Sequence, residues 1–484
     1  MADNKYANKD YGLGPLVMKF GGTSVGSPEA MVRTVNIIKK QRLEVKQLVV
    51  VISAMSGITD LLLTCANDAA AGNPEGYTKS ISLIRKRHLE AVENLPYSIQ
   101  SREKVNAIIQ EYLDRLHNYC VSIQTMGEVT PRGMDAITSL GERINVRLIS
   151  ELLLDQAIPN QPVDGDQLIV TDANFQNAHP LRELTTQKVN IVIVPLLKDK
   201  VIPIITGFLS GTEEGITTTL GRGGSDYTAA ILGDCLGAQE VWTWTDVDGV
   251  MTADPSVVTD AKVISHLSFD EVSEMAYFGA KVLHPKTMRP LIEKGIPLWV
   301  KNTFNPASAG TCISNQAQKI AGQLTCVTNI RDVSLVTVKG KGMLGVPGVA
   351  ARTFSAVAKE NASVLMISQS SSEQSICFVI PSHDERKVIQ SLRNELAFEL
   401  SRGDVDTINA FSDAVIVTAI GAGICHTPGV SANVFGALGN KKINVIAIAQ
   451  GSSEFSISMV VAKEEADAAV QEIHTEVIIN GNKQ

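Results

Sequence analysis

The first residues that could do chemistry follow a short apolar run near the start of the chain. Lys19 lies within that run, Gly21 and Gly22 come next, and a helix start follows at Ser27. Paired glycines let the backbone approach phosphate oxygens closely, and a lysine adds a compact positive charge that can bridge transferring phosphates. A tight strand-to-helix turn without a ligand fits the same pattern. The segment therefore predicts a phosphate site but leaves the plain turn open.

A second glycine-rich segment, TTTLGRGGSDYTAA (217–230), is typical of an anion site at the start of a helix. Arg222 could form a two-pronged contact with a carboxylate. Asp226 could hold Lys19 in place or contact a magnesium ion. The alternative is a hairpin on which Arg222 and Asp226 form a surface ion pair of little energetic value. Dense polar residues directly before an apolar helix favour the anion site.

Three further segments carry polar side chains at the ends of predicted elements. Thr245 and Asp246 close an aromatic-flanked run, where a hydroxyl and a carboxylate could hold a ribose or orient an adenine. Glu142 opens an otherwise apolar helix and could bind an ammonium group or satisfy the helix start. Lys281 lies near a helix end, where a lysine is common because of the helix dipole alone. An ordinary structural role remains open for each residue, including Asp246 as a turn residue.

Composition excludes several classes of protein. The chain has 484 residues, of which 44% are apolar and 19% charged, so we expect about two to four domains with large cores. A net charge of −8 argues against a nucleic-acid-binding protein. Seven scattered cysteines without a CxxC pair predict reduced thiols and no zinc site. The polar start and the short apolar runs predict no secretion signal and no membrane span. A cytoplasmic protein is expected.

The elements that must position these residues are predicted from hydrophobic patterning. Near-continuous β-branched runs predict buried strands at Leu16–Phe20, Gln47–Ser53, Asn190–Pro195, Val201–Thr206, Glu240–Thr245 and Ile296–Lys301. Such runs suit a mainly parallel sheet covered by helices on both faces. From about residue 77 to 123, apolar residues recur at helical spacing, which predicts a helical insertion beside the sheet.

The last third of the chain contains an internal repeat. Residues 345–380 align without gaps on residues 426–461, with 15 identical pairs among 36. Each copy reads as strand, Pro-Gly loop, helix, strand, turn and strand, which fits a ferredoxin-like split βαβ module. A Pro-Gly turn that opens a helix offers free N–H groups to an amino acid's carboxylate. The alternative is a pair of modules that stabilise a dimer and sense nothing.

Five motifs in this order are similar to those of aspartate kinases, within the amino-acid kinase fold: KFGGTSV, VVVISAMSGITDLL, GER, TTLGRGGSDYTAA and WTDVDGV…DP…FGAKVLHP. The repeats resemble the two ACT modules that aspartate kinases append. The resemblance covers nearly the whole chain. It implies an α/β protein, with a mainly parallel three-layer αβα kinase domain followed by two ferredoxin-like (ACT) α+β modules.

The implied boundaries place a catalytic domain at residues 1–313, with the helical insertion at about 77–123. A linker follows at 314–327, then a first ACT-like module at 328–410 and a second at 411–484. Family members often interleave the two modules, so an interleaved pair is the alternative to a simple boundary near Phe411.

The implied reaction is ATP-dependent phosphorylation of the L-aspartate side chain, the first step of the branch leading to lysine, threonine and methionine. A carboxylate nucleophile is already ionised at pH 7, so no general base is required. Catalysis then reduces to positioning and to charge neutralisation by lysine, arginine and Mg²⁺, the metal being held chiefly by ATP oxygens.

The resemblance implies roles for individual residues. Contacts to the transferring phosphate fall on Lys19, Gly21 and Gly22, which Asp226 would organise. Contacts to aspartate fall on Ser53, Thr59, Glu142, Thr219, Arg222 and Ser225. Nucleotide contacts fall on Lys19, Thr245, Asp246, Met251, Ser256 and Lys281. Tyrosine and arginine are the residues expected where Met251 and Ser256 stand, so details of nucleotide binding depart from the pattern.

Feedback regulation by an end-product amino acid is also implied. The implied effector contacts are Met343, Val346, Gly348, Val349, Gln369 and Gln450. Equivalent glutamines bind the effector in the threonine-responsive branch, and Gly345-Val346 replaces the lysine-responsive His and Ser. Threonine is therefore favoured over lysine. A homodimer or homotetramer through the ACT-like modules is expected, with no nucleic acid and no membrane as partner. The competing readings are a sibling kinase acting on glutamate, acetylglutamate or UMP, and a catalytically inactive amino-acid-sensing scaffold.

Overall fold

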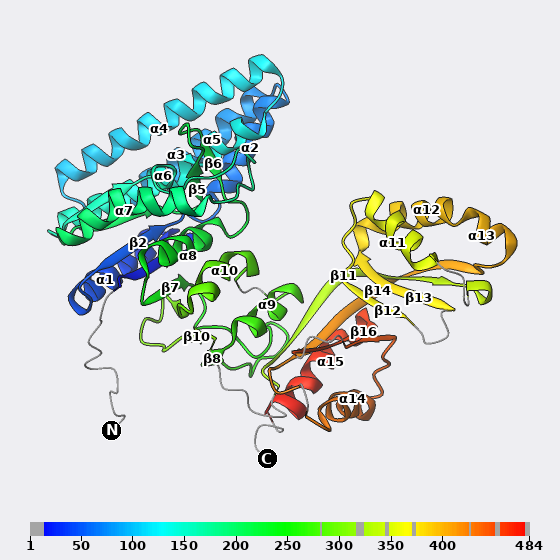
Figure 1. The fold of residues 1–484 in the computed structure, drawn as a ribbon. Helices are drawn as coiled ribbons and strands as arrows, with labels where there is room; N and C mark the ends of the chain where they lie inside the picture. Colours follow the sequence, from blue (N-terminus) through cyan, green and yellow to red (C-terminus); the bar gives the residue numbers. More distant parts are fainter. Residues whose placement is uncertain are drawn as a thin grey trace, which may run out of the picture. The chain divides into compact units, whose positions relative to one another are not determined.

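The computed structural model describes residues 14–280, 283–315, 324–343, 348–369, 374–424, 427–450 and 455–479 (Figure 1). These residues form two compact units. Unit 1 holds residues 14–250, 265–269 and 283–315, and unit 2 holds residues 251–264, 270–280 and the described residues from 324 onward. Residues 251–264 and 270–280, predicted within the catalytic domain, therefore pack with the repeats.

Unit 1 is built on an eight-stranded, mainly parallel sheet in the order β3-β4-β2-β1-β7-β9-β10-β8. Its central strands are buried and all parallel, as predicted: β4 (Ile202–Thr206), β2 (Leu48–Ile52), β1 (Leu16–Phe20), β7 (Glu240–Thr245) and β9 (Leu298–Asn302). The outer strands are β3 (Asn160–Val163), β10 (Thr311–Ile313) and β8 (His266–Leu267), and β10 runs antiparallel to β9. Since parallel strands end at one edge, the segments after β1, β2 and β7 meet there.

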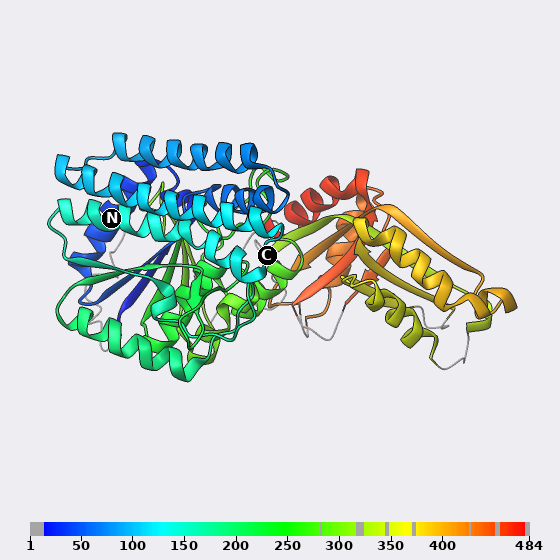
Figure 2. The same ribbon diagram turned by 90° about the horizontal axis from the view of Figure 1, so that it is seen from above.

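Helices cover both faces of this sheet (Figure 2). One face packs on α1 (Pro28–Glu44), α2 (Ile58–Ala70), α3 (Pro74–Asn94), α4 (Ile99–Met126) and α6 (Leu140–Asp155), the last preceded by α5 (Pro131–Thr138). The other carries α7 (Arg182–Lys198), α8 (Gly224–Leu236) and α10 (Pro285–Lys294). Ser27 caps α1 by accepting from the Ala30 N–H, with Pro28 first in the helix, as predicted. The predicted helical insertion corresponds to α3 and α4.

One predicted strand is wrong. Residues 190–195 lie inside helix α7, whose buried face carries Thr185, Val189, Ile193 and Leu197 at four-residue spacing. The β-branched run Ile-Val-Ile-Val suggested a strand, but burial of this helical stripe outweighs the weak local preference of β-branched residues. Pro195 sits within the last turn of the helix, whose end follows at Lys198.

Unit 2 is built on a six-stranded antiparallel sheet in the order β12-β13-β11-β14-β16-β15. The strands are β11 (Cys326–Lys339), β12 (Met366–Gln369), β13 (Ser375–Pro381), β14 (Thr407–Ile420), β15 (Ala447–Ala449) and β16 (Ser456–Ala462). The helices are α9 (Phe269–Tyr277), α11 (Val349–Lys359), α12 (Glu385–Glu395), α13 (Ala397–Arg402), α14 (Val430–Asn440) and α15 (Ala466–Ile473).

The two repeats share the long strands β11 and β14. The start of β11 pairs with the end of β14, Cys326 opposite Ile420, within the second repeat's part of the sheet. The end of β11 pairs with the start of β14, Lys339 opposite Thr407, and with β13 of the first repeat. Each long strand therefore serves both repeats, which is the interleaved arrangement. The boundary predicted between residues 410 and 411 falls inside β14.

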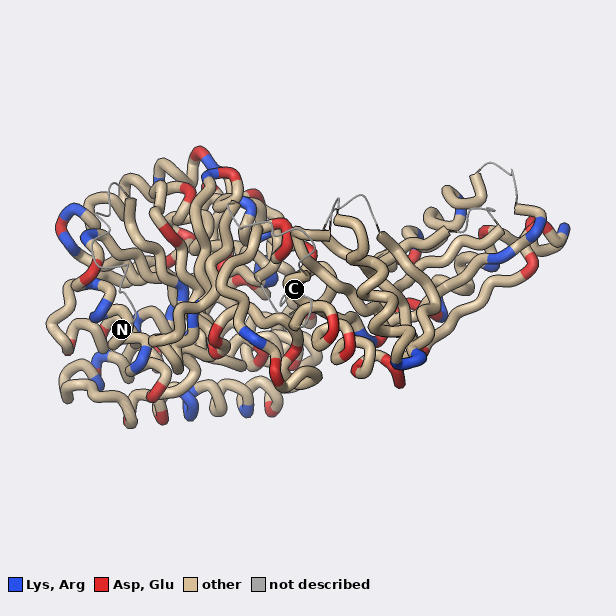
Figure 3. Tube along the Cα trace, turned by 90° about the horizontal axis from the view of Figure 1, so that it is seen from below, with Lys and Arg blue, Asp and Glu red and all other residues tan. Residues whose placement is uncertain are grey.

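Charges of both signs are interspersed along the chain (Figure 3). Among the described residues, no helix combines the length and apolarity that a membrane span requires.

Candidate active site

An ion pair between a buried lysine and a half-buried aspartate lies near the end of the central strands. Lys19 on β1 is 8% exposed, and its Nζ lies 2.8 Å from Oδ1 of Asp226 in the first turn of α8. The Thr243 hydroxyl of the neighbouring strand β7 donates to the same oxygen at 3.3 Å. Since the opposite charges compensate each other away from water, the ammonium group is held in one place. The structure thus brings together the lysine and the aspartate of two separate motifs.

The glycine turn after β1 fits closely against two neighbouring segments. The Gly21 N–H donates to the Trp244 carbonyl at 3.1 Å, and the Ser56 N–H donates to the Gly22 carbonyl at 3.2 Å. A Cβ on Gly22 would lie 3.1 Å from the Ala54 oxygen. A side chain there would be in tight contact with the backbone of the neighbouring loop, so glycine favours the close approach of the two loops.

The loop after β2 places two more of the predicted residues near this turn. Ser53 is buried, its N–H donates to the Phe20 carbonyl at 3.2 Å, and its carbonyl accepts from the Asn145 amide at 2.6 Å. Thr59 is half-buried and is the second residue of α2. The loops after β1 and β2 therefore lie side by side, joined to α6 through Asn145.

Glu142 is a buried carboxylate that is only partly satisfied. It is the third residue of α6, is 4% exposed, and its Oε2 has no hydrogen-bond partner among the described residues. Burial raises its pKa to about 8, although hydrogen bonds from its own N–H and that of Ala54 act in the opposite direction. A Cβ on Gly141 would lie 3.0 Å from the Ala54 Cβ, so the helix packs tightly on the loop after β2. An unpartnered buried carboxylate next to a loop is typical of a cation-binding site.

The second glycine-rich segment leads from a hairpin into α8. Strands β5 (Leu209–Gly211) and β6 (Thr217–Thr219) form the hairpin, and Gly221 and Gly223 then adopt φ of 76° and 72°, which favours glycine. Arg222 between them is exposed, which leaves its guanidinium group accessible to an anion. Ser225 packs closely on Gly207: a Cβ on Gly207 would lie 2.6 Å from the Ser225 Oγ.

Thr219, predicted to contact aspartate, is engaged by Asp135. Thr219 is 1% exposed, and both its N–H and its hydroxyl donate to the Asp135 carboxylate, at 3.0 and 2.8 Å. The Gln176 N–H donates to the same carboxylate. Burial raises the pKa of Asp135, and the hydrogen bonds from Gln176 and Thr219 oppose that rise. The Thr219 hydroxyl hydrogen is therefore already committed within the protein.

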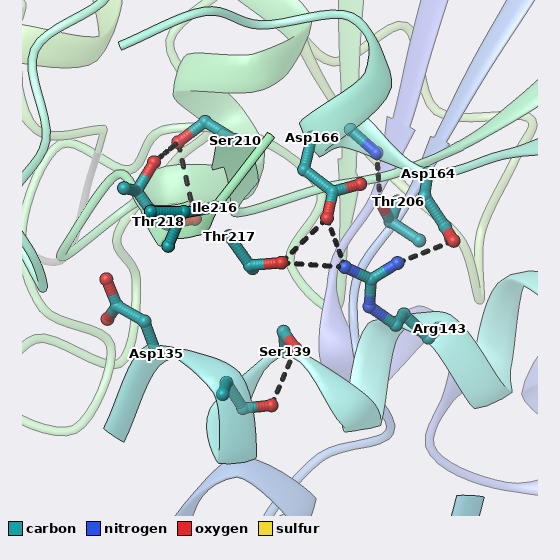
Figure 4. A network of polar contacts seen from close by, with 12 residues as sticks. Asp135, Ser139, Arg143, Asp164, Asp166, Thr206, Ser210, Ile216, Thr217 and Thr218 are labelled. Carbon is teal, nitrogen blue, oxygen red and sulfur yellow. Dashed lines mark hydrogen bonds and ion pairs between the residues drawn. The ribbon is translucent and has the colours of Figure 1, made fainter. Parts of the chain in front are cut away.

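A network of charges holds the other end of the same hairpin (Figure 4). The Arg143 guanidinium group contacts Asp166 and, at 2.6 Å, Asp164, and it also donates to the Thr217 hydroxyl at 3.2 Å. Arg147 pairs with Asp164 at 2.8 Å. Burial alone would raise the pKa of Asp164, but the two guanidinium groups hold it below its usual range. The network ties α6 to Thr217 on strand β6, two residues before Thr219, which Asp135 holds.

The residues predicted to bind the nucleotide are divided between the units. Thr245 and Asp246 end β7 in unit 1, with the Thr245 hydroxyl 3.1 Å from Asp246 Oδ1. Met251 pairs with Val263 in unit 2, and Ser256 caps a turn there by donating to Asp254 through its N–H and its hydroxyl. Lys281 lies outside the described residues.

The predicted effector residues all belong to unit 2. Met343 is buried, Gly348 has φ of 91° at the start of α11, and Val349 is the first residue of that helix. Gln369 ends β12 and Gln450 follows β15, and both are exposed, at equivalent places in the two repeats. Val346 lies outside the described residues.

Sequence reasoning missed Asp135 and Arg143. A signal was present for Arg143, since Arg143 and Arg147 are spaced four apart ahead of the pair Asp164 and Asp166. Asp135 lies on α5, a helix that was not predicted. Such charges must find partners when buried.

Comparison with known families matches the first part of the sequence, including residues 251–264 and 270–280 that pack with the repeats, to one family and the repeats to another. Residues 14–302 match the amino acid kinase family, and residues 336–396 and 417–477 each match the ACT domain. The bifunctional aspartokinase/homoserine dehydrogenase of Haemophilus influenzae is 34% identical over 96% of this chain and 57% of its own length. Aspartokinase 3, chloroplastic, of Arabidopsis thaliana is 33% identical over 95% of this chain and 81% of its own length. The chain spans about half the length of the bifunctional relatives.

Two solved structures of one enzyme each cover 96% of this chain. E. coli aspartokinase III, in complex with aspartate and ADP, aligns with a TM-score of 0.76 and 31% identity, over 96% of this chain and 99% of that one. The same enzyme in complex with lysine and aspartate aligns with a TM-score of 0.76 and 32% identity, over the same shares of the two chains.

Proposed function

The chain belongs to the amino acid kinase family, and within it to the aspartokinases, and from this premise we propose that it transfers the γ-phosphoryl group of ATP to the side-chain carboxylate of L-aspartate. The product would be the acyl phosphate 4-phospho-L-aspartate, an intermediate of amino-acid biosynthesis. The aspartate carboxylate attacks the γ-phosphorus, the bond to the ADP oxygen breaks, and no proton has to be removed from the nucleophile.

The ion pair of Lys19 and Asp226 carries this proposal. Charge develops on the phosphoryl oxygens and the leaving oxygen, and a fixed ammonium group beside the Gly21-Gly22 turn is suited to neutralise it. Asp226 keeps that ammonium group in position, so no rearrangement is needed during transfer. The backbone of the glycine turn can approach the phosphate because it carries no side chains.

Acceptor binding is assigned to Glu142 and Arg222, with Ser53, Thr59 and Ser225 in supporting contacts. Glu142 would accept from the α-ammonium group of aspartate, which supplies the partner that its Oε2 lacks. Arg222, exposed beside two glycines, would fork onto a carboxylate. Thr219 contributes through its bonds to Asp135, and any direct contact it makes would be as a hydrogen-bond acceptor.

The nucleotide side is assigned to Lys19, Thr245 and Asp246 of unit 1, and the roles of Met251, Ser256 and Lys281 stay predictions from the sequence. Mg²⁺ would enter with ATP as part of the substrate, because this ion keeps water and phosphate oxygens as ligands and uses only one or two protein carboxylates. Asp226 and Asp246 are the carboxylates offered for that role. The cytoplasm is the proposed compartment, in keeping with scattered unpaired cysteines.

The test is formation of acyl phosphate, trapped as its hydroxamate, from ATP, Mg²⁺ and L-aspartate. We expect aspartate-dependent product, and a loss of about a thousandfold or more in kcat for Lys19→Ala. Lys104→Ala is the matched control, since Lys104 also pairs with a carboxylate, Glu151, but lies on the helical insertion. Full activity of Lys19→Ala would contradict the assignment.

Two alternatives are outcomes of the same assay. Product with L-glutamate, acetylglutamate or UMP but not with L-aspartate would make the chain a sibling kinase. Absence of product with every acceptor would indicate a sensing scaffold without catalysis.

We further propose regulation by an end-product amino acid bound at the repeats. Threonine is favoured over lysine because Gln369 and Gln450 resemble the glutamines of the threonine-responsive branch and Gly345-Val346 replaces the lysine-responsive His and Ser. Initial rates across separate threonine and lysine titrations test this, and flat activity up to about 10 mM threonine would overturn it; a coupling of about 1–3 kcal/mol suffices for strong inhibition. A homodimer or homotetramer through the repeats is part of the proposal, and light scattering of the purified protein measures it.

A further inference from the structure

The acceptor side of the site is made of two separate pieces of chain. Glu142, assigned to the ammonium group, lies on α6, whereas Arg222 and Ser225, assigned to carboxylates, follow the β5–β6 hairpin. Recognition of an amino dicarboxylate depends on the spacing between these pieces. Something in the protein must therefore fix the hairpin relative to the helices.

Asp135 joins the hairpin to α5, the helix that directly precedes α6. It lies on α5, seven residues before Glu142, and is 1% exposed. Its carboxylate accepts from the Thr219 N–H at 3.0 Å and the Thr219 hydroxyl at 2.8 Å, at the last position of β6. A buried carboxylate with several donors holds them in a defined geometry, since loss of any one leaves a polar group unsatisfied.

The same carboxylate also fixes the loop that packs against Gly221, in the second glycine-rich segment. Asp135 accepts from the Gln176 N–H at 3.0 Å, and Gln176 has φ of 68°. A Cβ on Gly221 would lie 3.0 Å from the Gln176 oxygen and 3.1 Å from Asn177 Oδ1, so this loop packs directly on the residue before Arg222. The 172–179 loop and β6 are also joined by the Ala178 N–H, which donates to the Thr219 carbonyl at 3.0 Å.

We infer that Asp135 is a positioning residue that sets the spacing between the ammonium-binding and carboxylate-binding sides of the acceptor site, and so selects the chain length of the dicarboxylate. The inference rests on the proposed function. Asp135 does not touch the substrate and acts through Thr219 and Gln176. Arg143 supports the same hairpin at Thr217, from the residue next to Glu142.

Asp135→Asn tests the inference, because the amide presents a donor toward groups that are all donors. We expect KM for L-aspartate to rise about tenfold, KM for ATP to stay within about twofold, and the kcat/KM preference for L-aspartate over L-glutamate to fall about tenfold, the range that one methylene group commands. A general loss of folding would move both KM values or neither.

Asp155→Asn is the matched control. Asp155 also accepts several hydrogen bonds, from the Ser98 N–H and the Ser98 and Ser101 hydroxyls, but it lies at the far end of α6 and holds the helical insertion. This variant should keep the wild-type KM values and the wild-type preference.

Thr219 provides a second route if Asp135→Asn does not fold. Thr219→Val removes only the hydroxyl bond to Asp135 and should raise KM for L-aspartate about threefold, with KM for ATP within about twofold of wild type. The inference is overturned if wild-type enzyme is active while Asp135→Asn and Thr219→Val keep its aspartate preference. Absence of wild-type activity would instead contradict the proposed function itself.

Discussion

Two glutamates with the same helical position and the same burial have different surroundings. Glu142 is the third residue of α6 and Glu271 is the third residue of α9, and each is 4% exposed. Oε2 of Glu142 has no partner among the described residues, whereas Oε1 of Glu271 accepts from the Thr325 hydroxyl at 2.7 Å and the Ala422 N–H at 3.1 Å. Burial alone therefore does not distinguish a ligand site from a structural contact. The hydrogen-bond partners of each carboxylate distinguish the two cases.

The largest expected effect comes from making the same substitution at both positions. Glu142→Gln should lower kcat/KM for L-aspartate about 500-fold, because removing one member of a buried ion pair costs about 3–5 kcal/mol. KM for ATP should stay within about twofold. Glu271→Gln should leave both parameters near wild type. An equal loss of aspartate kinetics in the two variants would break the comparison.

The second effect is on stability and depends on pH. Because burial raises the pKa of Glu142 from 4.5 to about 8, the folded protein binds this proton more tightly than the unfolded chain. The contribution of Glu142 to the free energy of unfolding is therefore full below pH 4.5 and falls as pH rises from 4.5 to about 8. The full pKa shift corresponds to roughly 4–5 kcal/mol of unfolding free energy, and we expect a measured effect of about half that size.

Denaturant unfolding of wild type and Glu142→Gln at pH 5.5 and pH 8 measures this effect. The variant should gain about 2 kcal/mol relative to wild type between the two pH values, since it lacks the titrating group. Taking the difference between the proteins removes the contribution of other carboxyl groups. The same difference in unfolding free energy between the two proteins at both pH values would show that burial does not keep Glu142 protonated.

The third expected effect is release of the Glu142 proton when L-aspartate binds, which should not depend on Glu271. At pH 7 a group with a pKa of about 8 is mostly protonated, and pairing with the α-ammonium group of aspartate favours its ionised form. Binding of L-aspartate should therefore release close to one proton per site. Calorimetry in buffers with different ionisation enthalpies measures this release. Glu271→Gln should release as much as wild type, and no dependence on the buffer would contradict the pairing.

Much of the site could be predicted from sequence because its motifs follow strand ends. The runs at β1 and β2 are mostly apolar and the run at β7 is rich in aromatic and β-branched residues. Their parallel packing, and with it the meeting of Gly21, Ser53 and Thr245 at one sheet edge, therefore follows from pattern. The pairing of Lys19 with Asp226 was one of two roles left open for Asp226, and the resemblance to aspartate kinases implied it. The run in α7 misled because β-branched residues fit both a strand and a buried helical stripe.

The anchors behind the site could not be predicted from local pattern. The Asp135 bond to Thr219 spans 84 positions, and the Glu271 bond to Ala422 spans 151. Nothing in the local sequence specifies such partners, because they depend on how the elements pack. The grouping of residues 251–264 and 270–280 with the repeats was missed for the same reason: Glu271 and Glu274 bind Thr325, Ala422 and Ser456, which only the tertiary structure brings near.

The smallest expected effect is on the free energy of unfolding of Glu271→Gln, because both named hydrogen bonds of Glu271 use the same carboxylate oxygen. Both of the hydrogen bonds from Thr325 and Ala422 go to Oε1, and the carbonyl oxygen of a glutamine can accept both. Glu271→Gln keeps these two acceptor contacts but loses the charge and should lose about 1 kcal/mol, whereas Glu271→Ala leaves both donors unsatisfied and should lose about 2–3 kcal/mol. Denaturant midpoints of the three proteins test this order. A stability gain in Glu271→Gln would mean that this carboxylate is as poorly partnered as Glu142, and the distinction drawn between the two residues would fail.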